Sequence, residues 1–584
     1  MDKKQVAALL DEMGTLFELR GENPFKCRAF HNAARVVESL SEDLSALVAD
    51  GRIREVKGIG EHLSKLITEM VQNGKCSEYE DVKSSIPDGL MHMIRIPGLG
   101  PKRVKVLFEK LKIATIEELR NACQNHRLVK LDGFGEKTEE NILKGIDLLA
   151  SVSNKFLYPQ AREEAAAIAE SLRQLKAVRQ CEIAGSLRRR KEIVGDIDIV
   201  VSADQKNRTR IFDHFVTLPA VQKVIGRGDT KSSVMFSSGI QCDLRIVSDA
   251  EFPFALNYFT GSKEHNVEMR SRARTLGLSL NEYGFSKVEE KGTQARRAVP
   301  HCKNEAEIYQ ALKLTFIPPE LRENTGEIEA AAAGGLPSLI EDKDIRGTFH
   351  CHTNYSDGLN TLEEMAEGAR ALGWQYLGIA DHSKAAAYAG GLTVEKVKQQ
   401  LKAIDALNAR SKGFRLFKGT EVDIMSDGSL DYSDKVLSSF DYVVAAIHSK
   451  FKMTEEEATK RMIKALKNKY VTFIAHPTGR LLLSREGYPI NMTQVIEAAA
   501  DYGKGIEINA HPFRLDLDWR FVRYAKEKKV PLYVTPDAHT IAGLRDVYYG
   551  VGIARKGWLS AADVVNTWNV RKVEALFSSL RTGR

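Results

Sequence analysis

The sequence lacks the features of membrane and secreted proteins. No apolar run approaches the roughly 18 residues that a membrane-spanning helix needs. The start, MDKKQVAALLDEMG, is typical of a helix and has no signal-peptide core. The seven cysteines include no CxxC pair, which favours reduced cytosolic thiols. We therefore expect a cytoplasmic protein with no membrane partner.

The composition is that of a soluble globular protein, with 43% hydrophobic and 28% charged residues. Its 584 residues are enough for about three or four domains. The net charge of +7 permits nucleic-acid binding without demonstrating it. Prolines, an alanine-glycine patch and acidic residues predict a linker at 318–344.

The last third of the chain carries residues of the kinds that bind metal ions. Six of the 14 histidines lie there in short motifs with acidic residues. The residues in these motifs are His350, His352, Asp357, Asp381, His382, Glu421, His448, His476, Asp537 and His539. Such a set indicates a multinuclear metal centre, whereas histidines that only cap strands are the structural alternative.

The spacing of these residues predicts an α/β barrel. TFHCH is typical of a strand, where side chains alternate, so His350 and His352 should point the same way. Apolar runs precede other ligands: YLGIA before Asp381, YVVAAI before His448 and VTFIA before His476. Buried strands that end in a ligand, with helical stretches between them, place the chemistry at the C-terminal ends of the strands.

From about Arg346 onward the chain resembles a PHP domain, of the polymerase and histidinol phosphatase superfamily. The resemblance implies a distorted seven-stranded β/α barrel with two to three metal ions. It implies nine ligands, at His350, His352, Asp357, His382, Glu421, His448, His476, Asp537 and His539. His511 has no place in that set, and we expect it to support the site. Histidine-rich mixed ligation favours Mn²⁺, Zn²⁺ or Fe²⁺ over Mg²⁺.

Three similar strings lie in the first 150 residues: VKGIGEHLSKLI, IPGLGPKRVKVLF and LDGFGEKTEENIL. Each matches the helix-hairpin-helix motif, in which a glycine turn and a helix N-terminus bind a phosphate without reading bases. The candidate DNA-backbone residues are Gly58, Gly60, Gly98, Gly100, Lys102, Arg103, Gly133 and Gly135. The alternative is that these glycines only turn the chain.

A nucleotidyltransferase core is indicated by IAGSLRRRKEIVGDIDIVV, between Ile183 and Val201. Strand alternation places Asp196 and Asp198 on one face, and Asp243 lies in another strand, IQCDLRIV. Three carboxylates on adjacent strands can hold two Mg²⁺ (or Mn²⁺) ions for phosphoryl transfer. Ser186 and Arg189 would contact the phosphates.

This stretch resembles the palm of family X DNA polymerases, and NYFTGSKEHNVEMRSRARTLGLSLNEYGF, from Asn257, resembles their thumb. The opening GENPFKCRAFHNAARVV resembles their small N-terminal domain. The resemblance implies a nucleotide-binding set of Gly185, Ser186, Arg189, Tyr258, Phe259, Gly261 and Asn266, and a template contact at Arg270.

One position departs from the family pattern. In polymerase beta a lysine after the first hairpin forms a Schiff base with a 5′-deoxyribose phosphate. Leu66 occupies that position here, and Lys65 lies roughly 100° around the helix. We therefore expect little lyase activity.

The fold expected is multidomain: an α-helical front with helix-hairpin-helix motifs, an α+β nucleotidyltransferase palm and thumb, and a C-terminal distorted β/α barrel. The expected domains are 1–90 and 91–155 (both helical), 156–255 (palm), 256–317 (thumb), 318–344 (linker) and 345–584 (PHP).

The order of these domains is that of bacterial and archaeal family X polymerases. It implies gap filling in DNA repair, a 3′→5′ exonuclease, and action on abasic sites and 3′-phosphates. We expect gapped or primer–template DNA and dNTPs as partners, and a monomer. The alternatives are a barrel that is a small-molecule phosphatase or only structural, and a DNA-binding scaffold without catalysis.

Overall fold

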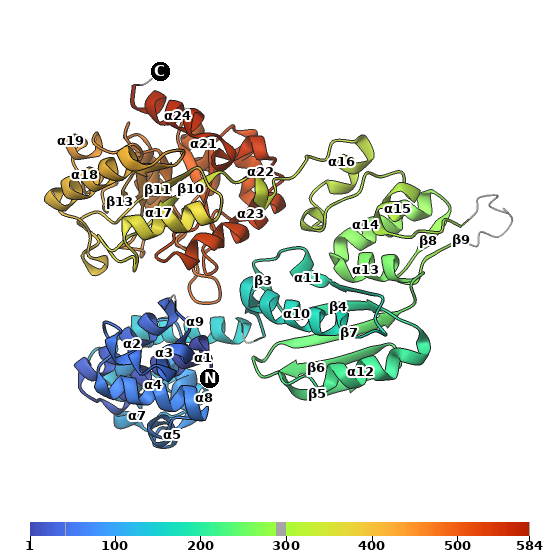
Figure 1. Cartoon of the computed structure of the whole chain (residues 1–584), viewed down its shortest axis with the longest axis horizontal. Helices are drawn as coiled ribbons and strands as arrows, with labels where there is room; N and C mark the ends of the chain where they lie inside the picture. The colour runs from blue at the N-terminus through green and yellow to red at the C-terminus, as the bar shows by residue number, and fades with distance from the viewer. Residues whose placement is uncertain (41, 153, 288–298, 583–584) are drawn as a thin grey trace. The chain divides into compact units, whose positions relative to one another are not determined.

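The computed structural model describes residues 1–40, 42–152, 154–287 and 299–582 (Figure 1). It divides into two compact units, Met1–Ser153 and Asn154–Arg584. Within the described residues, no helix has the length and apolar character needed to cross a membrane. The expected multidomain fold class is confirmed by the elements below.

The N-terminal unit is helical and has one hydrophobic core. Its helices are α1 (Lys3–Arg20), α2 (Pro24–Ser39), α3 (Leu44–Ala49), α4 (Glu61–Asn73), α5 (Ser77–Ser84), α6 (Asp88–Ile94), α7 (Pro101–Leu111), α8 (Ile116–Gln124) and α9 (Glu136–Val152), with short 3₁₀ turns η1 (Arg52–Glu55) and η2 (Leu128–Lys130). The boundary expected at residue 90 falls inside α6, and side chains from both sides of it pack into the same core. Helices α4, α7 and α9 each follow one of the three glycine strings.

The palm is a five-stranded sheet in the order β2-β4-β7-β6-β5. Its strands are β2 (Gln180–Ile183), β4 (Asp196–Ser202), β5 (Val221–Arg227), β6 (Lys231–Phe236) and β7 (Gln241–Val247). Ile197, Ile199 and Val201 pack against α10 (Tyr158–Arg173) and α12 (Arg208–Val216) on one face. On the other face Val200 packs against α13 (Phe252–Thr260), and this is the face of Asp196 and Asp198.

The thumb consists of α14 (Lys263–Thr275), the hairpin of β8 (Leu278–Leu280) and β9 (Phe285–Lys287), and α15 (Glu305–Ala311). The expected linker is folded: it contains η4 (Pro319–Leu321), α16 (Glu327–Ala333) and η5 (Asp342–Asp344). It buries Arg322 and Glu327 completely, and α16 is seen beside α15 in Figure 1. This segment therefore packs as part of the thumb's core instead of forming an open tether.

The C-terminal region is a ring of parallel strands with helices outside it (Figure 1). The strands are β10 (Gly347–Cys351), β11 (Tyr376–Ile379), β12 (Arg415–Lys418), β13 (Glu421–Asp423), β14 (Val444–Ala446), β15 (Phe473–Ile474), β16 (Gly505–Asn509) and β17 (Leu532–Thr535). Only two residues separate β12 from β13. These two short strands therefore occupy one strand position, and the barrel has seven such positions. Bridges from His382 to Glu421 and from Cys351 to Ala538 join the two sheets, as expected for a distorted barrel.

The helices of the barrel are α17 (Leu362–Ala371), α18 (Val394–Arg410), α19 (Asp434–Leu437), α20 (Glu455–Leu466), α21 (Met492–Asp501), α22 (Trp519–Glu527), α23 (Val547–Lys556) and α24 (Val570–Thr582). Nearly every strand residue is buried, because helices cover the outside and side chains fill the inside. At the N-terminal end of the strands, Phe577 of α24 packs against Phe349, Phe417 and Tyr442 and closes the barrel.

Candidate active sites in the palm and the barrel

The three palm aspartates lie together on neighbouring parallel strands. In the register of β4 and β7, Asp198 is directly opposite Asp243, and Asp196 is two residues before Asp198. Gly185, with φ +64°, lies against this group, and a Cβ atom there would be 2.4 Å from Asp198 Oδ2. The close approach of the backbone to the carboxylate thus requires glycine.

The pKa values of the three aspartates are shifted in different directions. Burial, together with repulsion from Asp196 and Asp243, raises the pKa of Asp198 to about 7. Burial, and then Asp243, raises the pKa of Asp196 as well. Burial disfavours ionisation of Asp243 too, but Lys231, whose Nζ is 2.5 Å from Oδ2, helps to lower its pKa. Carboxylates that are buried together and repel one another in this way favour the binding of a divalent cation.

The expected nucleotide and template residues come from α11, α13 and α14 and the turns between them. Ser186 is in the short helix α11 (Gly185–Arg188), which begins where β2 ends. Tyr258 and Phe259 form an edge-to-face pair with ring centroids 5.2 Å apart at the end of α13. The Asn266 amide donates to the Tyr258 carbonyl over 2.7 Å, which fixes its orientation. Arg270 is exposed on α14.

Arg189 differs from its expected role. Its guanidinium donates to the Thr260 carbonyl over 2.5 Å and to Glu323 over 3.1 Å. Gly261, at φ +66°, leaves room for it, since a Cβ there would be 3.2 Å from Nη1. Arg189 therefore ties the palm to the thumb and to the 318–344 segment, and is not directed at a free phosphate. A partner 134 residues away gave no local signal in the sequence.

The three glycine hairpins share one geometry. Gly58, Gly98 and Gly133 have φ values of +96°, +82° and +80°. Gly60 and Gly100 are the N-caps of α4 and α7, and no side chain caps either helix. Open space surrounds the Cβ positions of Gly60, Gly98, Gly100, Gly133 and Gly135. These turns thus present backbone N–H groups outward, as phosphate binding requires.

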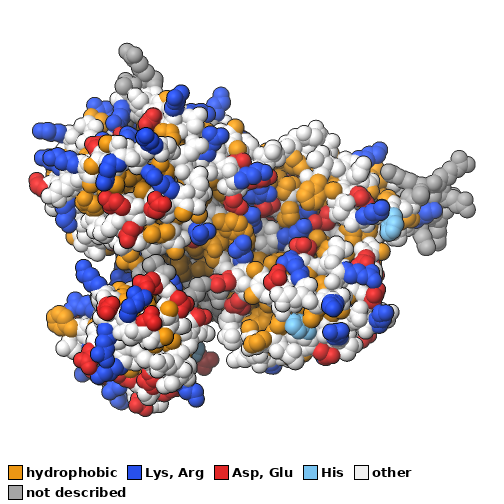
Figure 2. Space-filling view, in the orientation of Figure 1, with side chains coloured by type: hydrophobic (Ala, Val, Ile, Leu, Met, Phe, Trp, Pro, Cys, Tyr) orange, Lys and Arg blue, Asp and Glu red, His pale blue; other side chains and the backbone are white. Residues whose placement is uncertain are grey.

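Around the second hairpin, Lys102 is exposed and the Arg103 guanidinium donates to the Gly98 carbonyl over 3.0 Å. In the first hairpin's helix, Leu66 is buried in the core, and the exposed Lys65 pairs with Glu61 over 2.9 Å. On the face shown in Figure 2, Lys and Arg side chains of the N-terminal unit are interspersed with Asp and Glu.

All nine expected barrel ligands come together. They form four overlapping groups whose ligand atoms lie within 4.8 Å of one another: His352, Asp357, His382 and His539; His350, His476 and Asp537; His350, His352 and Glu421; His382, Glu421 and His448. Most of the ligands lie at or after the C-terminal ends of strands β10, β11, β14, β15 and β17, and Glu421 is the first residue of β13. The arrangement brings together side chains that span 190 residues of sequence.

The donor atoms fit metal ions. Glu421 has four histidine nitrogens 2.9–3.3 Å from its oxygens, from His350, His382, His448 and His476. Buried nitrogens of His350, His352, His382 and His476 and Oε2 of Glu421 make no hydrogen bond in the described structure. Buried polar atoms without partners are costly, and a divalent cation would satisfy them.

The pKa values of Glu421 and His352 are both lowered in the barrel cluster. Burial disfavours ionisation of Glu421, yet His448, His350 and His382 hold its pKa well below the usual range. Burial, with neighbouring His539 and His382, lowers the pKa of His352 to about 3. A neutral imidazole is the form that binds a metal ion.

His350 reaches the cluster by a different route from the one expected. It has φ +57°, and the register of β10 with β11 shifts between Thr348 and Cys351. Simple strand alternation therefore does not describe β10, although His350 and His352 both reach Glu421.

Supporting residues surround the ligands, and sequence reasoning missed most of them. Glu507 contacts His350 Nδ1 over 2.5 Å and accepts from the His476 backbone N–H over 2.6 Å. Asp423 contacts His448 Nδ1 over 2.8 Å. A charged residue in the buried strand GIEIN was the available signal for Glu507. Asp381, which the sequence grouped with the ligands, instead accepts hydrogen bonds from Thr353 and Gln400.

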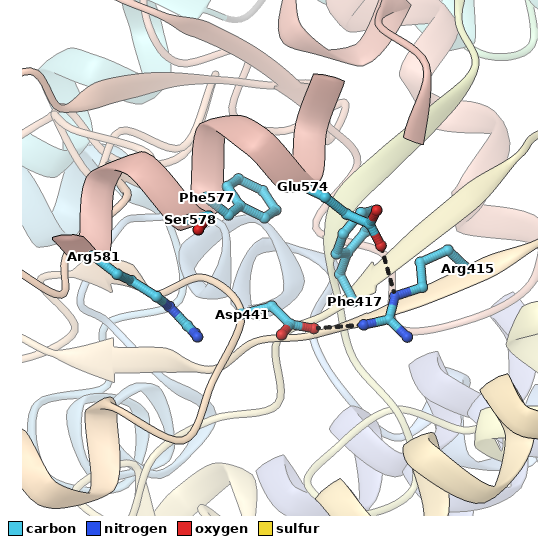
Figure 3. A pocket seen from close by; sticks show the side chains of 7 residues that line it. All are labelled: Arg415, Phe417, Asp441, Glu574, Phe577, Ser578 and Arg581. Atoms are coloured by element: carbon cyan, nitrogen blue, oxygen red, sulfur yellow. Dashed lines mark ion pairs between the residues drawn. The ribbon is translucent and has the colours of Figure 1, made fainter. Parts of the chain in front are cut away.

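A pocket of about 270 Å³ lies under α24 at the opposite end of the barrel (Figure 3). Arg415 pairs there with Asp441 and Glu574, as the dashed lines show. The pocket contains none of the nine ligands, so the candidate chemistry lies at the other end of the strands.

Family models match four parts of the chain. They are the helix-hairpin-helix domain (1–76), the SAM-like helix-hairpin-helix tandem (90–147), the DNA polymerase beta thumb (255–323) and the PHP domain (348–511). These matches agree with the resemblances found in the sequence.

Relatives match either the whole chain or one part of it. The DNA polymerase/3′-5′ exonuclease PolX of Bacillus subtilis is 40% identical, over 98% of this chain and 99% of its own length. DNA polymerase lambda of Rattus norvegicus is 25% identical over 46% of this chain and 48% of its own. A protein of Caldanaerobacter subterraneus named "Probable phosphatase" is 34% identical over 28% of this chain and 62% of its own. The chain therefore belongs to the bacterial PolX type of family X DNA polymerases, which join polymerase and PHP domains.

Proposed function

We propose that the chain carries two activities in separate sites: template-directed DNA synthesis in the palm and metal-dependent 3′→5′ exonuclease action in the barrel. The observation that carries the proposal is that each region assembles a complete set of metal-binding side chains, three aspartates in one and nine ligands in the other. The name of the 40% identical PolX relative includes both activities.

In the palm, Asp196, Asp198 and Asp243 would hold two Mg²⁺ or Mn²⁺ ions. When bound, the ions acidify the primer 3′-hydroxyl and neutralise charge on the leaving pyrophosphate. Gly185 and Ser186 bring the start of α11 beside the aspartates, where the triphosphate would lie. The palm otherwise accelerates the reaction by holding the primer 3′-hydroxyl and the incoming triphosphate close together.

Selection of the nucleotide falls to the thumb side of the site. Tyr258 and Phe259 limit the space beside the incoming sugar, and Gly261 allows the turn between α13 and α14. Asn266, fixed by the Tyr258 carbonyl, faces the minor-groove edge of the new pair, and Arg270 contacts the template strand.

In the barrel, the nine ligands would hold two to three Mn²⁺, Zn²⁺ or Fe²⁺ ions. When bound, such ions acidify the attacking water and neutralise the scissile phosphate. Glu507 and Asp423 orient His350 and His448 for this role, since each contacts the Nδ1 atom and so directs Nε2 toward Glu421, where it would bind the metal.

The DNA backbone would be held by Gly58, Gly60, Gly98, Gly100, Gly133 and Gly135, with Lys102 and Arg103 adding charge. We assign gapped or primer–template DNA and dNTPs as substrates, and base excision repair as the setting. Action on abasic sites and 3′-phosphates, a cytoplasmic location, a monomeric state and the limits given above for the palm, the thumb and the barrel belong to the same proposal. The open hairpin amides and the match to helix-hairpin-helix models support its DNA-binding part.

A small-molecule phosphatase in the barrel is the second candidate. It is favoured by the "Probable phosphatase" relatives, which match 28–32% of the chain. Fold and ligand set do not distinguish a phosphomonoester from a DNA end.

One assay tests both activities. A labelled primer–template is incubated with and without dNTPs, in Mg²⁺ and in Mn²⁺, alongside p-nitrophenyl phosphate as a small-molecule probe. We expect extension with dNTPs and 3′ shortening without them. Hydrolysis of the phenyl phosphate with no shortening would support the phosphatase.

A further inference from the structure

Two exposed aromatic side chains flank the barrel's metal ligands. Phe513 is 51% exposed and its ring stacks 5.7 Å from that of His511. Tyr388 is 74% exposed and its ring lies 6.3 Å from that of the ligand His382. Tyr388 buries little of its surface and Phe513 only about half, so packing alone does not account for both rings.

The ligand rings lie in a row between these two aromatics. His352 stacks on His539 with ring centroids 4.2 Å apart, and its ring is tilted against that of His382 at 4.5 Å. His539 and Asp537 line a pocket of about 320 Å³ together with Phe513 and His511. The Phe513 side of the row is thus a hollow that opens directly on two metal ligands.

The hollow also carries a cation. Arg514 lines it, with Nε 3.4 Å from Asp537 Oδ2 and only 20% of its side chain exposed. A largely buried guanidinium beside a metal cluster suits an anionic ligand such as a phosphodiester.

The loop that presents Phe513 is held in place before any ligand binds. The Leu482 N–H donates to the Phe513 carbonyl over 2.6 Å, and the Arg514 N–H donates to the His511 carbonyl over 2.8 Å. Arg480 Nε donates to the Arg514 carbonyl over 2.9 Å. An aromatic ring fixed in this way loses little conformational entropy when a base stacks on it.

We propose that this pocket binds the terminal nucleotide of a single-stranded DNA 3′ end, with its base stacked on Phe513, its phosphate facing Arg514, and the preceding base against Tyr388. This inference rests on the proposed exonuclease and deepens it, because it names the part of the substrate that the barrel recognises. Stacking tolerates every base, as an exonuclease requires. A small phosphomonoester would have no use for either ring.

The test compares two labelled single-stranded oligonucleotides, one with a normal 3′-terminal nucleotide and one whose last residue lacks its base. Full-length protein with Mn²⁺ and no dNTPs removes that residue. Since stacking contributes roughly 1–3 kcal/mol per base, we expect the wild type to favour the base-bearing end about tenfold. Phe513→Ala should lose that preference, because it should remove the normal 3′-terminal nucleotide more slowly while its rate on the base-less end stays unchanged. Phe513→Trp should retain the preference.

The matched control is Tyr502→Ala, which removes a 42% exposed aromatic at the end of α21, and it should behave as wild type. Metal content of each protein is measured by mass spectrometry and should not change. If Phe513→Ala slowed removal of the 3′-terminal residue equally on both oligonucleotides, the inference would be overturned, because the ring would then matter only for the structure of the site. A wild type that shortens neither oligonucleotide would instead refute the exonuclease on which the inference rests.

Discussion

At the scale of single residues, Gly185 is the position where the palm has least room. Its positive φ and the 2.4 Å separation between an added Cβ and Asp198 Oδ2 leave no space for a methyl group. Asp198 would have to move, and a 1 Å misplacement of a reacting group costs about 10² in rate.

Gly185→Ala should therefore slow primer extension about a hundredfold, measured under single-turnover conditions, while 3′ shortening without dNTPs stays at the wild-type rate. Gly195→Ala is a matched control, since 3.8 Å separates its Cβ position from the nearest atom. Extension by Gly185→Ala at the wild-type rate would show that Asp198 does not need its present position.

Leu66 gives a second prediction at this scale. It is buried in the core and Lys65 is on the surface with Glu61, so no lysine occupies the Schiff-base position. Borohydride should trap little protein on a 5′-incised abasic duplex. Efficient trapping that disappears in Lys65→Ala would contradict this expectation.

The sequence predicted the barrel ligands well, because each follows an apolar strand or lies in a short motif. It could not predict Glu507 or Asp423, whose roles depend on the imidazoles they contact across the barrel. The pairing of Arg189 with Glu323 was missed for a related reason: Glu323 lies in a segment that looked like a linker.

At the scale of elements, the hairpin glycines repeat one structure three times, and helices α4 and α7 after the first two begin without side-chain caps. Each hairpin is encoded by a short glycine pattern and the helix that follows it, so the sequence alone was sufficient to predict the three hairpins. The strand break between β12 and β13 and the irregular β10 were not predicted, since both arise from the closure of the barrel.

Changing Lys102 and Arg103 together to alanine should flatten the log–log salt dependence of DNA binding by about one to two units. The measurement is anisotropy titration of a gapped duplex at several salt concentrations. Lys75→Ala, away from the hairpin turns, should leave the slope unchanged. An unaltered slope in the double variant would remove both residues from the DNA footprint.

At the scale of the C-terminal unit, the palm, the 318–344 segment and the barrel share buried ion pairs. Glu323 pairs with Arg189 of the palm and, over 2.8 Å, with Lys556 of α23. Glu320 pairs with Arg190 and Arg555 in the same way. The composition of residues 318–344 suggested a linker, because composition does not reveal ion pairs with residues far away in the sequence.

Lys556→Met should lower the free energy of unfolding by about 3 kcal/mol, since it leaves a buried carboxylate short of a partner. Thermal denaturation of the full chain measures the effect. Lys528→Met, which breaks the exposed pair with Glu497, should leave stability nearly unchanged, because solvent screens that pair. Equal stability of the two variants would show that the buried pair does not hold the barrel to the palm.

The two metal sites on this chain should act independently, and a crossed primer–template assay measures whether they do. Asp196→Ala and His352→Ala proteins are each assayed with and without dNTPs. Asp196→Ala should lose extension and keep 3′ shortening, and His352→Ala should do the reverse. If either substitution abolished both activities while the protein stayed folded, or if shortening survived in His352→Ala, the account of separate sites would be contradicted.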